Sequence, residues 1–183
     1  MKKLTNDEIE FLTESNAIEK EYSTDALEDS KIAWDWAKKQ KSNPTLELML
    51  GIHKRLLKRL NPEIAGKIRK VRVGMMIKGE FNEAMDYHKI KEALESLCNP
   101  GIYPITSEEL IKEWHIHFEN IHPHEDGNGR TGRILMNLQR LEIGLPLLII
   151  HEGREQMKYY NWFRKNKWSI KNGIGVIKYD KTN

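Results

Sequence analysis

The sequence predicts a mainly α-helical bundle with one small β-hairpin. Apolar residues recur at spacings of three and four over long segments, helix-capping residues precede several of these segments, and strand-like alternation occurs in one place only. Helices of this kind bury their apolar stripes against each other, which gives a bundle.

Two helices are expected near the N-terminus. Thr5 and Glu8 have the spacing of a capping box, in which each side chain bonds the backbone N–H of the other residue. Apolar residues follow directly, so a first helix is expected here. A second helix is expected from about Asp25 to Lys41.

The next segment has the clearest helical pattern. Asn43 and Pro44 suit the N-cap and the first helical position. The segment Leu46–Leu60 then carries an apolar stripe, and its helix is expected to end at Asn61-Pro62, because the residue before a proline avoids the helical conformation.

Strand-like alternation is confined to the segment after this helix. Apolar residues alternate from Val71 to Ile77, which predicts a hairpin over Val71–Phe81. Further helices are expected from about Asn82 to Leu97 and after a second capping box at Thr106 and Glu109. The tail from Gly173 has no clear assignment.

Composition narrows the class of protein. The 183 residues favour one domain, and the net charge of +3 is too small to indicate nucleic-acid binding. There is no apolar run of about 20 residues and no signal-peptide core, so no membrane association is expected. The lone Cys98 cannot form an internal disulfide, which favours a reducing compartment, and the cytoplasm is the expected location.

The segment from residue 122 to 133, HPHEDGNGRTGR, has the features of an anion site. Gly127 and Gly129 flank Asn128 just ahead of a helical pattern from about Asn128 to Ile143. Glycines allow a close approach of backbone N–H groups to a ligand, and the first N–H groups of a helix point at an anion that the helix dipole also favours.

Charged residues of the same segment extend this hypothesis to polyphosphate. Arg130 and Arg133 lie on one face of the first helical turns, where two cations are unfavourable unless an anion lies between them. Guanidinium groups hold phosphate oxygens in a fork. Asp126 could serve Mg²⁺, and His122 is a natural general base for an attacking hydroxyl.

Each residue also has an ordinary structural explanation: a turn, an N-cap, a solvated arginine or a core histidine. Their combination within twelve residues favours the phosphate site. A zinc site is the weaker alternative. His115 and His117 lie two residues apart, and residues at that spacing on a helix do not share a face; no HExxH motif is present either. Its candidate ligands are His115, His117, His122 and His124.

The segment resembles the signature of the Fic family, HPxxDGNGRxxR, and the resemblance extends from about residue 10 to about residue 165. It implies a Fic-fold helical bundle in which residues 41–170 form the core and residues 171–183 a C-terminal tail. It also implies a protein adenylyltransferase, which transfers AMP from ATP to a Ser, Thr or Tyr hydroxyl.

The resemblance assigns a role to each residue of the motif. His122 would deprotonate the hydroxyl, and Asp126 would bind Mg²⁺ on the α- and β-phosphates. Gly127, Asn128 and Gly129 would line the anion hole. Arg130 and Arg133 would hold the β- and γ-phosphates. The Val71–Phe81 hairpin resembles the family's flap, along which a target segment adds as a strand.

Residues 1–40 would then form N-terminal helices with an inhibitory motif. The stretch from Ser15 to Glu19 resembles the family's S/T-x-x-x-E-G/N, with Lys20 in place of Gly or Asn. In self-inhibited relatives this Glu pairs with the second arginine of the motif, here Arg133, and blocks the γ-phosphate.

One departure from the family concerns His124, where Phe is usual. A buried imidazole there would need a hydrogen-bond partner. The sequence leaves open another nucleotide such as UTP or GTP, phosphate transfer, removal of AMP from targets, and a catalytically weak binding module. The target protein is not visible in the sequence, and the oligomeric state is open, with a homodimer among the alternatives.

Overall fold

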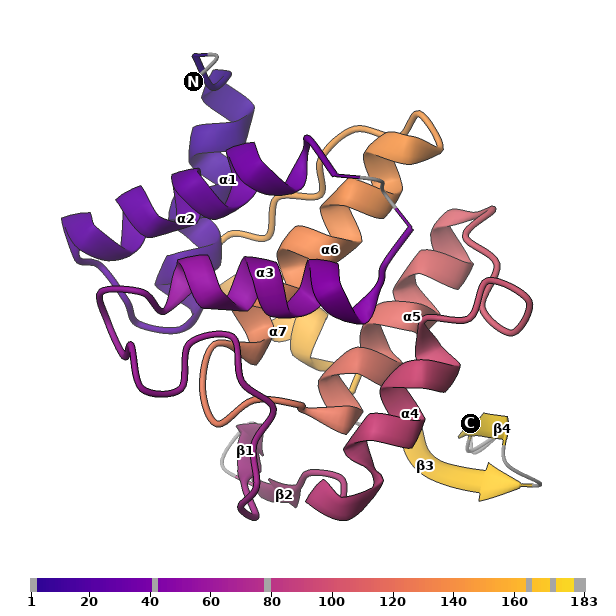
Figure 1. The fold of residues 1–183 in the computed structure, drawn as a ribbon. Coiled ribbons are helices and arrows are strands. Elements are labelled where there is room, and N and C mark those ends of the chain that lie inside the picture. Colours follow the sequence, from indigo (N-terminus) through magenta and orange to yellow (C-terminus); the bar gives the residue numbers. More distant parts are fainter. Residues whose placement is uncertain (1–2, 41–42, 78–79, 164–165, 172–173, 180–183) are drawn as a thin grey trace.

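The computed structural model describes residues 3–40, 43–77, 80–163, 166–171 and 174–179. Within these ranges the regular structure is mainly α-helical, with seven α-helices and two short antiparallel strand pairs at the periphery (Figure 1). The mainly α fold expected from the sequence is therefore confirmed.

The first three helices are α1 (Asn6–Ile18), α2 (Thr24–Ala37) and α3 (Leu46–Leu56). The expected capping box at the start of α1 is present. The third helix was placed wrongly at both ends, because Thr45 rather than Asn43 is its N-cap and it ends before Leu60. The Thr45 hydroxyl accepts the N–H of Leu48 at 3.1 Å, which starts the helix two residues later.

The hairpin consists of β1 (Gly74–Ile77) and β2 (Glu80–Glu83), with Ile77 opposite Glu80. Residues 78 and 79 of the expected hairpin lie outside the described residues. The alternating pattern began at Val71, but β1 begins later. The carbonyl of Val71 accepts a hydrogen bond from Arg69 Nη1 at 2.7 Å, so it is not free for a strand ladder.

Only the second half of the helix expected over residues 82–97 is confirmed. Its first part is β2 and a 3₁₀ turn, Tyr87–Lys89, and only α4 (Ile90–Leu97) is helical. The Asp86 side chain accepts the N–H of His88 at 3.1 Å and begins the turn there.

The second half of the chain contains α5 (Glu108–Ile121), α6 (Asn128–Glu142) and α7 (Arg154–Tyr160). The N-cap of α5 is Ser107 and not Thr106, since its hydroxyl accepts the N–H of Leu110 at 3.3 Å. The sequence did not predict α7, nor the strands β3 (Asn166–Lys171) and β4 (Ile174–Tyr179).

Helix α6 lies in the middle of the bundle and packs against α1, α3 and α5 (Figure 1). Its residues from Arg130 to Arg140 are all buried, as are the tryptophans Trp34 and Trp114 that fill the surrounding core. The motif residues at the start of α6 are thus held on a rigid element.

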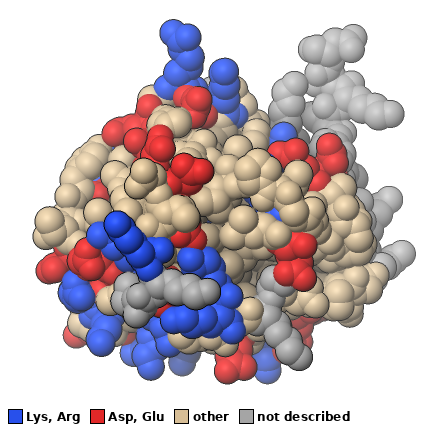
Figure 2. All heavy atoms as spheres, turned by 90° about the horizontal axis from the view of Figure 1, so that it is seen from above, with Lys and Arg blue, Asp and Glu red and all other residues tan. Residues whose placement is uncertain are grey.

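Figure 2 shows that basic and acidic side chains are interspersed over the upper face, in keeping with the net charge of +3. Among the described residues, no helix has the length and apolar character needed to cross a bilayer.

Candidate active site

The motif forms the connection between α5 and α6. Helix α5 ends at Ile121, and its C-cap His122 has a left-handed conformation with φ 50°; α6 starts after Gly127, which has φ 74°. A non-glycine residue in the left-handed region costs about 1–2 kcal/mol, so the surrounding contacts must hold His122 there.

Two stacked histidines, His53 and His124, fix the conformation of this loop. His53 Nδ1 accepts the N–H of Gly66 at 2.9 Å, which leaves Nε2 to donate to the carbonyl of Asp126, also at 2.9 Å. The His124 ring lies on His53, with centroids 3.6 Å apart and planes 6° from parallel. Burial lowers the pKa of His53 to about 4 and that of His124 to about 3, so both rings are neutral.

The partner that a buried His124 requires is the carbonyl of Lys67, to which its Nδ1 donates at 2.7 Å. The imidazole thus replaces the family's usual Phe by stacking and by one hydrogen bond. Its Nε2 atom has no partner among the described residues. The hydrogen bond to Lys67 nevertheless stabilises the loop in a way that a phenyl ring could not.

Asn128 closes the loop instead of facing a ligand with its side chain. Its Oδ1 accepts the N–H of His124 and its Nδ2 donates to the carbonyl of the same residue, both at 2.9 Å. Both polar atoms of the Asn128 side chain are therefore bonded to the backbone of the loop.

The two glycines differ in what an added side chain would meet. At Gly127 a Cβ would lie 2.6 Å from Leu57 Cδ2, in addition to the positive φ. At Gly129 a Cβ would lie 2.2 Å from Glu19 Oε1 and 2.8 Å from Arg133 Nη1. The Glu19 carboxylate therefore lies directly against the first turn of α6.

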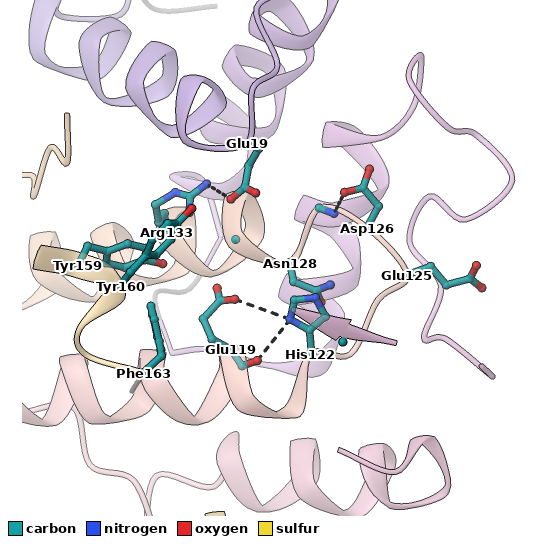
Figure 3. A pocket seen from close by; sticks show the side chains of 13 residues that line it. Glu19, Glu119, His122, Glu125, Asp126, Asn128, Arg133, Tyr159, Tyr160 and Phe163 are labelled. Carbon is teal, nitrogen blue, oxygen red and sulfur yellow. Dashed lines mark hydrogen bonds and ion pairs between the residues drawn. The ribbon is translucent and has the colours of Figure 1, made fainter. Parts of the chain in front are cut away.

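The imidazole of His122 faces the pocket (Figure 3). Its Nδ1 lies 3.3 Å from the carbonyl of Glu119, which favours the tautomer that donates from Nδ1 and keeps a lone pair on Nε2. Burial lowers the pKa of His122 to about 4, so the ring is neutral at pH 7 and able to accept a proton.

The structure adds Glu119, which the sequence analysis missed. Its carboxylate lies 3.9 Å from His122 Nδ1, and burial raises the pKa of Glu119 to about 8. A Cβ at Gly132 would lie 2.4 Å from Glu119 Oε1, so this glycine leaves room for the carboxyl group. The spacing of three residues between Glu119 and His122 on one helix was the available signal.

Arg133 reaches the N-terminal helix, as the resemblance implied. Its Nη2 donates to Glu19 Oε1 at 2.7 Å and to the carbonyl of Ser15 at 2.8 Å, and its Nε donates to Ser15 Oγ at 2.9 Å. The Arg133 side chain is 2% exposed and that of Glu19 is 36% exposed. Lys20, at the Gly/Asn position, has φ 60°, which explains why Gly or Asn suits that position.

Asp126 and Arg130 lie at the edge of the site. The Asp126 side chain is 63% exposed, and one of its oxygens is 3.5 Å from Arg130 Nη2. The guanidinium of Arg130 is buried, and among the described residues its Nε and Nη1 atoms have no hydrogen-bond partner. Arg130 does not line the pocket, whereas Asp126 and Arg133 do.

The pocket has a volume of about 300 Å³ and is closed on one side by three aromatic residues that the sequence analysis missed, Tyr159, Tyr160 and Phe163 (Figure 3). In the part of the chain that the structure describes, no group of three or more His, Cys, Asp or Glu residues could hold a metal ion. His115 instead bonds the Tyr159 hydroxyl at 2.8 Å, which removes one ligand from the zinc alternative.

Comparisons with known proteins show the family to which the chain belongs. Residues 43–139 match the model of the Fic/DOC family. The chain is 31% identical over 128 residues to "Protein adenylyltransferase Fic" of Drosophila virilis, covering 68% of this chain and 26% of the relative. The protein of the same name from Drosophila melanogaster is 30% identical over 128 residues, with 68% and 25% covered. The chain thus spans about a quarter of the length of these relatives.

Two solved structures show the same fold. A Fic-domain-containing signaling protein from Bacteroides thetaiotaomicron superimposes with a TM-score of 0.73 at 20% identity, over 86% of this chain and 70% of that one. A Fic family protein from Desulfovibrio desulfuricans gives a TM-score of 0.73 at 20% identity, over 85% and 55%. The family model spans more than half of the chain and includes the whole loop between α5 and α6, and the chain therefore belongs to the Fic/DOC family.

Proposed function

We propose that this chain is a protein adenylyltransferase that transfers AMP from ATP to a hydroxyl group of a protein. The observation that carries the proposal is the placement of the His122 imidazole in the same pocket as the glycine-lined start of α6. The family's adenylyltransferase relatives, at about 30% identity, support the same activity.

The start of α6 supplies the phosphate-binding groups. The first backbone N–H groups of a helix have no partner within the helix, and at Gly129 there is no side chain to cover them. Arg133 lines the pocket beside them. The unpartnered Nε and Nη1 atoms of the buried Arg130 are donors that a phosphate could satisfy after a side-chain rotation.

Asp126 is the residue that would hold Mg²⁺. One exposed carboxylate is a poor site alone, but Mg²⁺ commonly binds through one or two carboxylates together with substrate phosphates, so the residues present fit the ion. When bound with ATP, the ion would neutralise part of the phosphate charge.

The chemistry then follows from His122. Its Nε2 accepts the proton of the target hydroxyl while the oxygen attacks the α-phosphorus, the bond to the β-phosphate oxygen breaks, and pyrophosphate leaves. The N–H groups and the guanidinium of Arg133 stabilise the charge on the departing phosphates. The target segment would bind along the β1–β2 hairpin as an added strand.

Glu19 acts in this proposal as an internal anion that inhibits the enzyme. Its carboxylate bonds Arg133 and has an oxygen 2.2 Å from the position that a Cβ of Gly129 would take, so it would occupy the place of a terminal phosphate. Release of Glu19 would open the site for ATP in its reactive position.

The proposal is tested with ATP, GTP and UTP, each labelled at the α-phosphate, incubated with Glu19→Gly protein in host lysate. We expect transfer of label from ATP to protein, and none with the additional change His122→Ala. Transfer from GTP or UTP but not from ATP would show that ATP is not the nucleotide substrate. Absence of transfer from all three would contradict the proposal and favour a binding module.

A further inference from the structure

The buried Arg69 connects the hairpin to the end of α5, outside the motif that carries the chemistry. Its side chain is 2% exposed, and a guanidinium in such a place must direct its donors to acceptors. No carboxylate forms an ion pair with it among the residues that the structure describes. Its hydrogen bonds go instead to four main-chain carbonyls.

Two of these carbonyls belong to the end of α5. Arg69 Nε donates to the carbonyl of His122 at 2.7 Å, and Nη2 donates to that of Ile121 at 3.3 Å. The backbone N–H of Arg69 also donates to the carbonyl of Pro123 at 2.9 Å. These contacts surround the left-handed residue, so Arg69 supplies part of what keeps His122 in that conformation.

The other two carbonyls lie at the two ends of the hairpin. Nη1 donates to the carbonyl of Val71, which precedes β1, at 2.7 Å, and Nη2 donates to that of Met85, which follows β2. The N–H of Met85 in turn donates to the carbonyl of Asn120 on α5 at 3.3 Å. The Arg69 guanidinium therefore connects the segments that enter and leave the hairpin to the backbone of His122.

We propose that Arg69 is a positioning residue that joins the hairpin and His122 into one unit, so that a target strand bound along the hairpin places its hydroxyl at a fixed distance from the imidazole. The inference rests on the proposed adenylyltransferase function. Lysine cannot replace arginine here, because one ammonium cannot reproduce the planar fork that spans carbonyls on three segments.

A separate set of contacts holds the part of the α5–α6 loop that would bind phosphate. His53 bonds the carbonyl of Asp126, and Asn128 bonds the backbone of His124. Loss of the Arg69 contacts should therefore affect proton abstraction and target placement, while the binding of ATP should change little. A purely structural role would instead weaken both together.

The test compares Arg69→Lys with a matched control in the Glu19→Gly background. The control is Arg140→Lys, since Arg140 is also buried and its Nε also donates to a main-chain carbonyl, that of Pro146 at 2.9 Å. Each variant is assayed for the dissociation constant of Mg·ATP by calorimetry and for the rate of AMP transfer onto itself at saturating ATP. Displacement of a reacting group by about 1 Å can cost about 100-fold in rate. We expect that loss for Arg69→Lys at unchanged ATP affinity, and none for Arg140→Lys.

A pH profile provides a second readout. The charge of Arg69 contributes to lowering the pKa of His122. In Arg69→Gln the pKa of His122 should rise, so the acid limb of the rate profile moves to higher pH, whereas in Arg69→Lys the charge remains and the limb stays in place. A structural role alone would not separate these two variants.

The outcomes are distinguishable. If the Glu19→Gly parent transfers no AMP, the proposed function fails, and the inference fails with it. If the parent is active and Arg69→Lys keeps its rate, or loses ATP affinity in proportion to rate, the inference alone is wrong. If the variants do not fold, amide hydrogen exchange of the unsubstituted protein tests whether the hairpin and His122 form one unit. Equal protection of the Met85 and His122 amides supports one unit, and much faster exchange at Met85 contradicts it.

Discussion

Replacement of Glu19 by Gln should tighten the binding of Mg·ATP. The carboxylate of Glu19 lies against the first turn of α6 and bonds Arg133 at 2.7 Å, so it competes with phosphate for the same donors. The amide of Gln keeps the size of the side chain and removes its charge. The change therefore isolates the competition of an internal anion from any effect of shape.

The magnitude follows from the contact. A hydrogen bond to a charged group contributes about 1.5–3 kcal/mol, and the lower end applies because Glu19 is 36% exposed and solvent screens the pair. A difference of about 1.4 kcal/mol is tenfold in the dissociation constant. We therefore expect Glu19→Gln to bind Mg·ATP about tenfold more tightly.

Thermal unfolding should show the opposite sign without nucleotide. Arg133 is almost fully buried, and removal of its charged partner leaves a less well compensated charge, so the Tm of the free protein should fall. ATP should then raise the Tm of Glu19→Gln more than it raises that of the parent. A variant that is simply less stable would lose Tm under both conditions equally.

The assay is calorimetric titration of Mg·ATP in a His122→Ala background, which prevents turnover. The matched control is Glu14→Gln on the same helix, whose carboxylate bonds the N–H of Glu152 at 2.8 Å, away from Arg133. Equal affinity of the Glu19→Gln, Glu14→Gln and parent proteins would refute the competition.

Three further predictions concern stability and activity. Burial lowers the pKa values of five histidines to about 3 to 4: His53, His115, His117, His122 and His124. Below pH 6.5 the unfolded chain therefore binds more protons at these residues than the folded chain does, and the free energy of unfolding in urea should fall from pH 7 to pH 5. A free energy that stays constant over this range would contradict the prediction. Gly132→Ala places a Cβ 2.4 Å from Glu119 Oε1 and should destabilise by about 1–3 kcal/mol in urea unfolding, whereas Gly101→Ala should cost little; equal midpoints would show that the site can adjust. Ser15→Ala removes the hydroxyl that accepts from Arg133 Nε, and in the otherwise unsubstituted protein AMP transfer onto itself should increase severalfold, less than in Glu19→Gly; an unchanged rate would exclude Ser15 from the inhibition.

The sequence predicted the parts of this molecule that local signals determine. The Thr5 capping box, the helix that starts at Asn128 and the mainly α character follow from spacing and capping chemistry. The loop with Gly127 was predicted because its glycines have no other ready explanation in so short a segment.

The parts that the sequence analysis missed depend on contacts between distant segments. The strand expected from Val71 begins later because Arg69 takes its carbonyl, and no pattern near Val71 reveals this. Tyr159 and Tyr160, which line the pocket, belong to a seven-residue helix that is too short for periodicity to detect, and Phe163 lies in the turn that follows it. The partner of His124 is a main-chain carbonyl more than fifty residues away, so the sequence showed the need for a partner but not its identity.

In the proposed reaction the loop between α5 and α6 directs AMP, and not the terminal phosphate, onto a hydroxyl. The most direct measurement incubates Glu19→Gly protein with ATP labelled at either the α- or the γ-phosphate and follows label on protein, with Glu19→Gly/His122→Ala as the control. We expect label from the α position only, and we expect His122→Ala to abolish it. Label from the γ position, or transfer that persists without the imidazole, would contradict it.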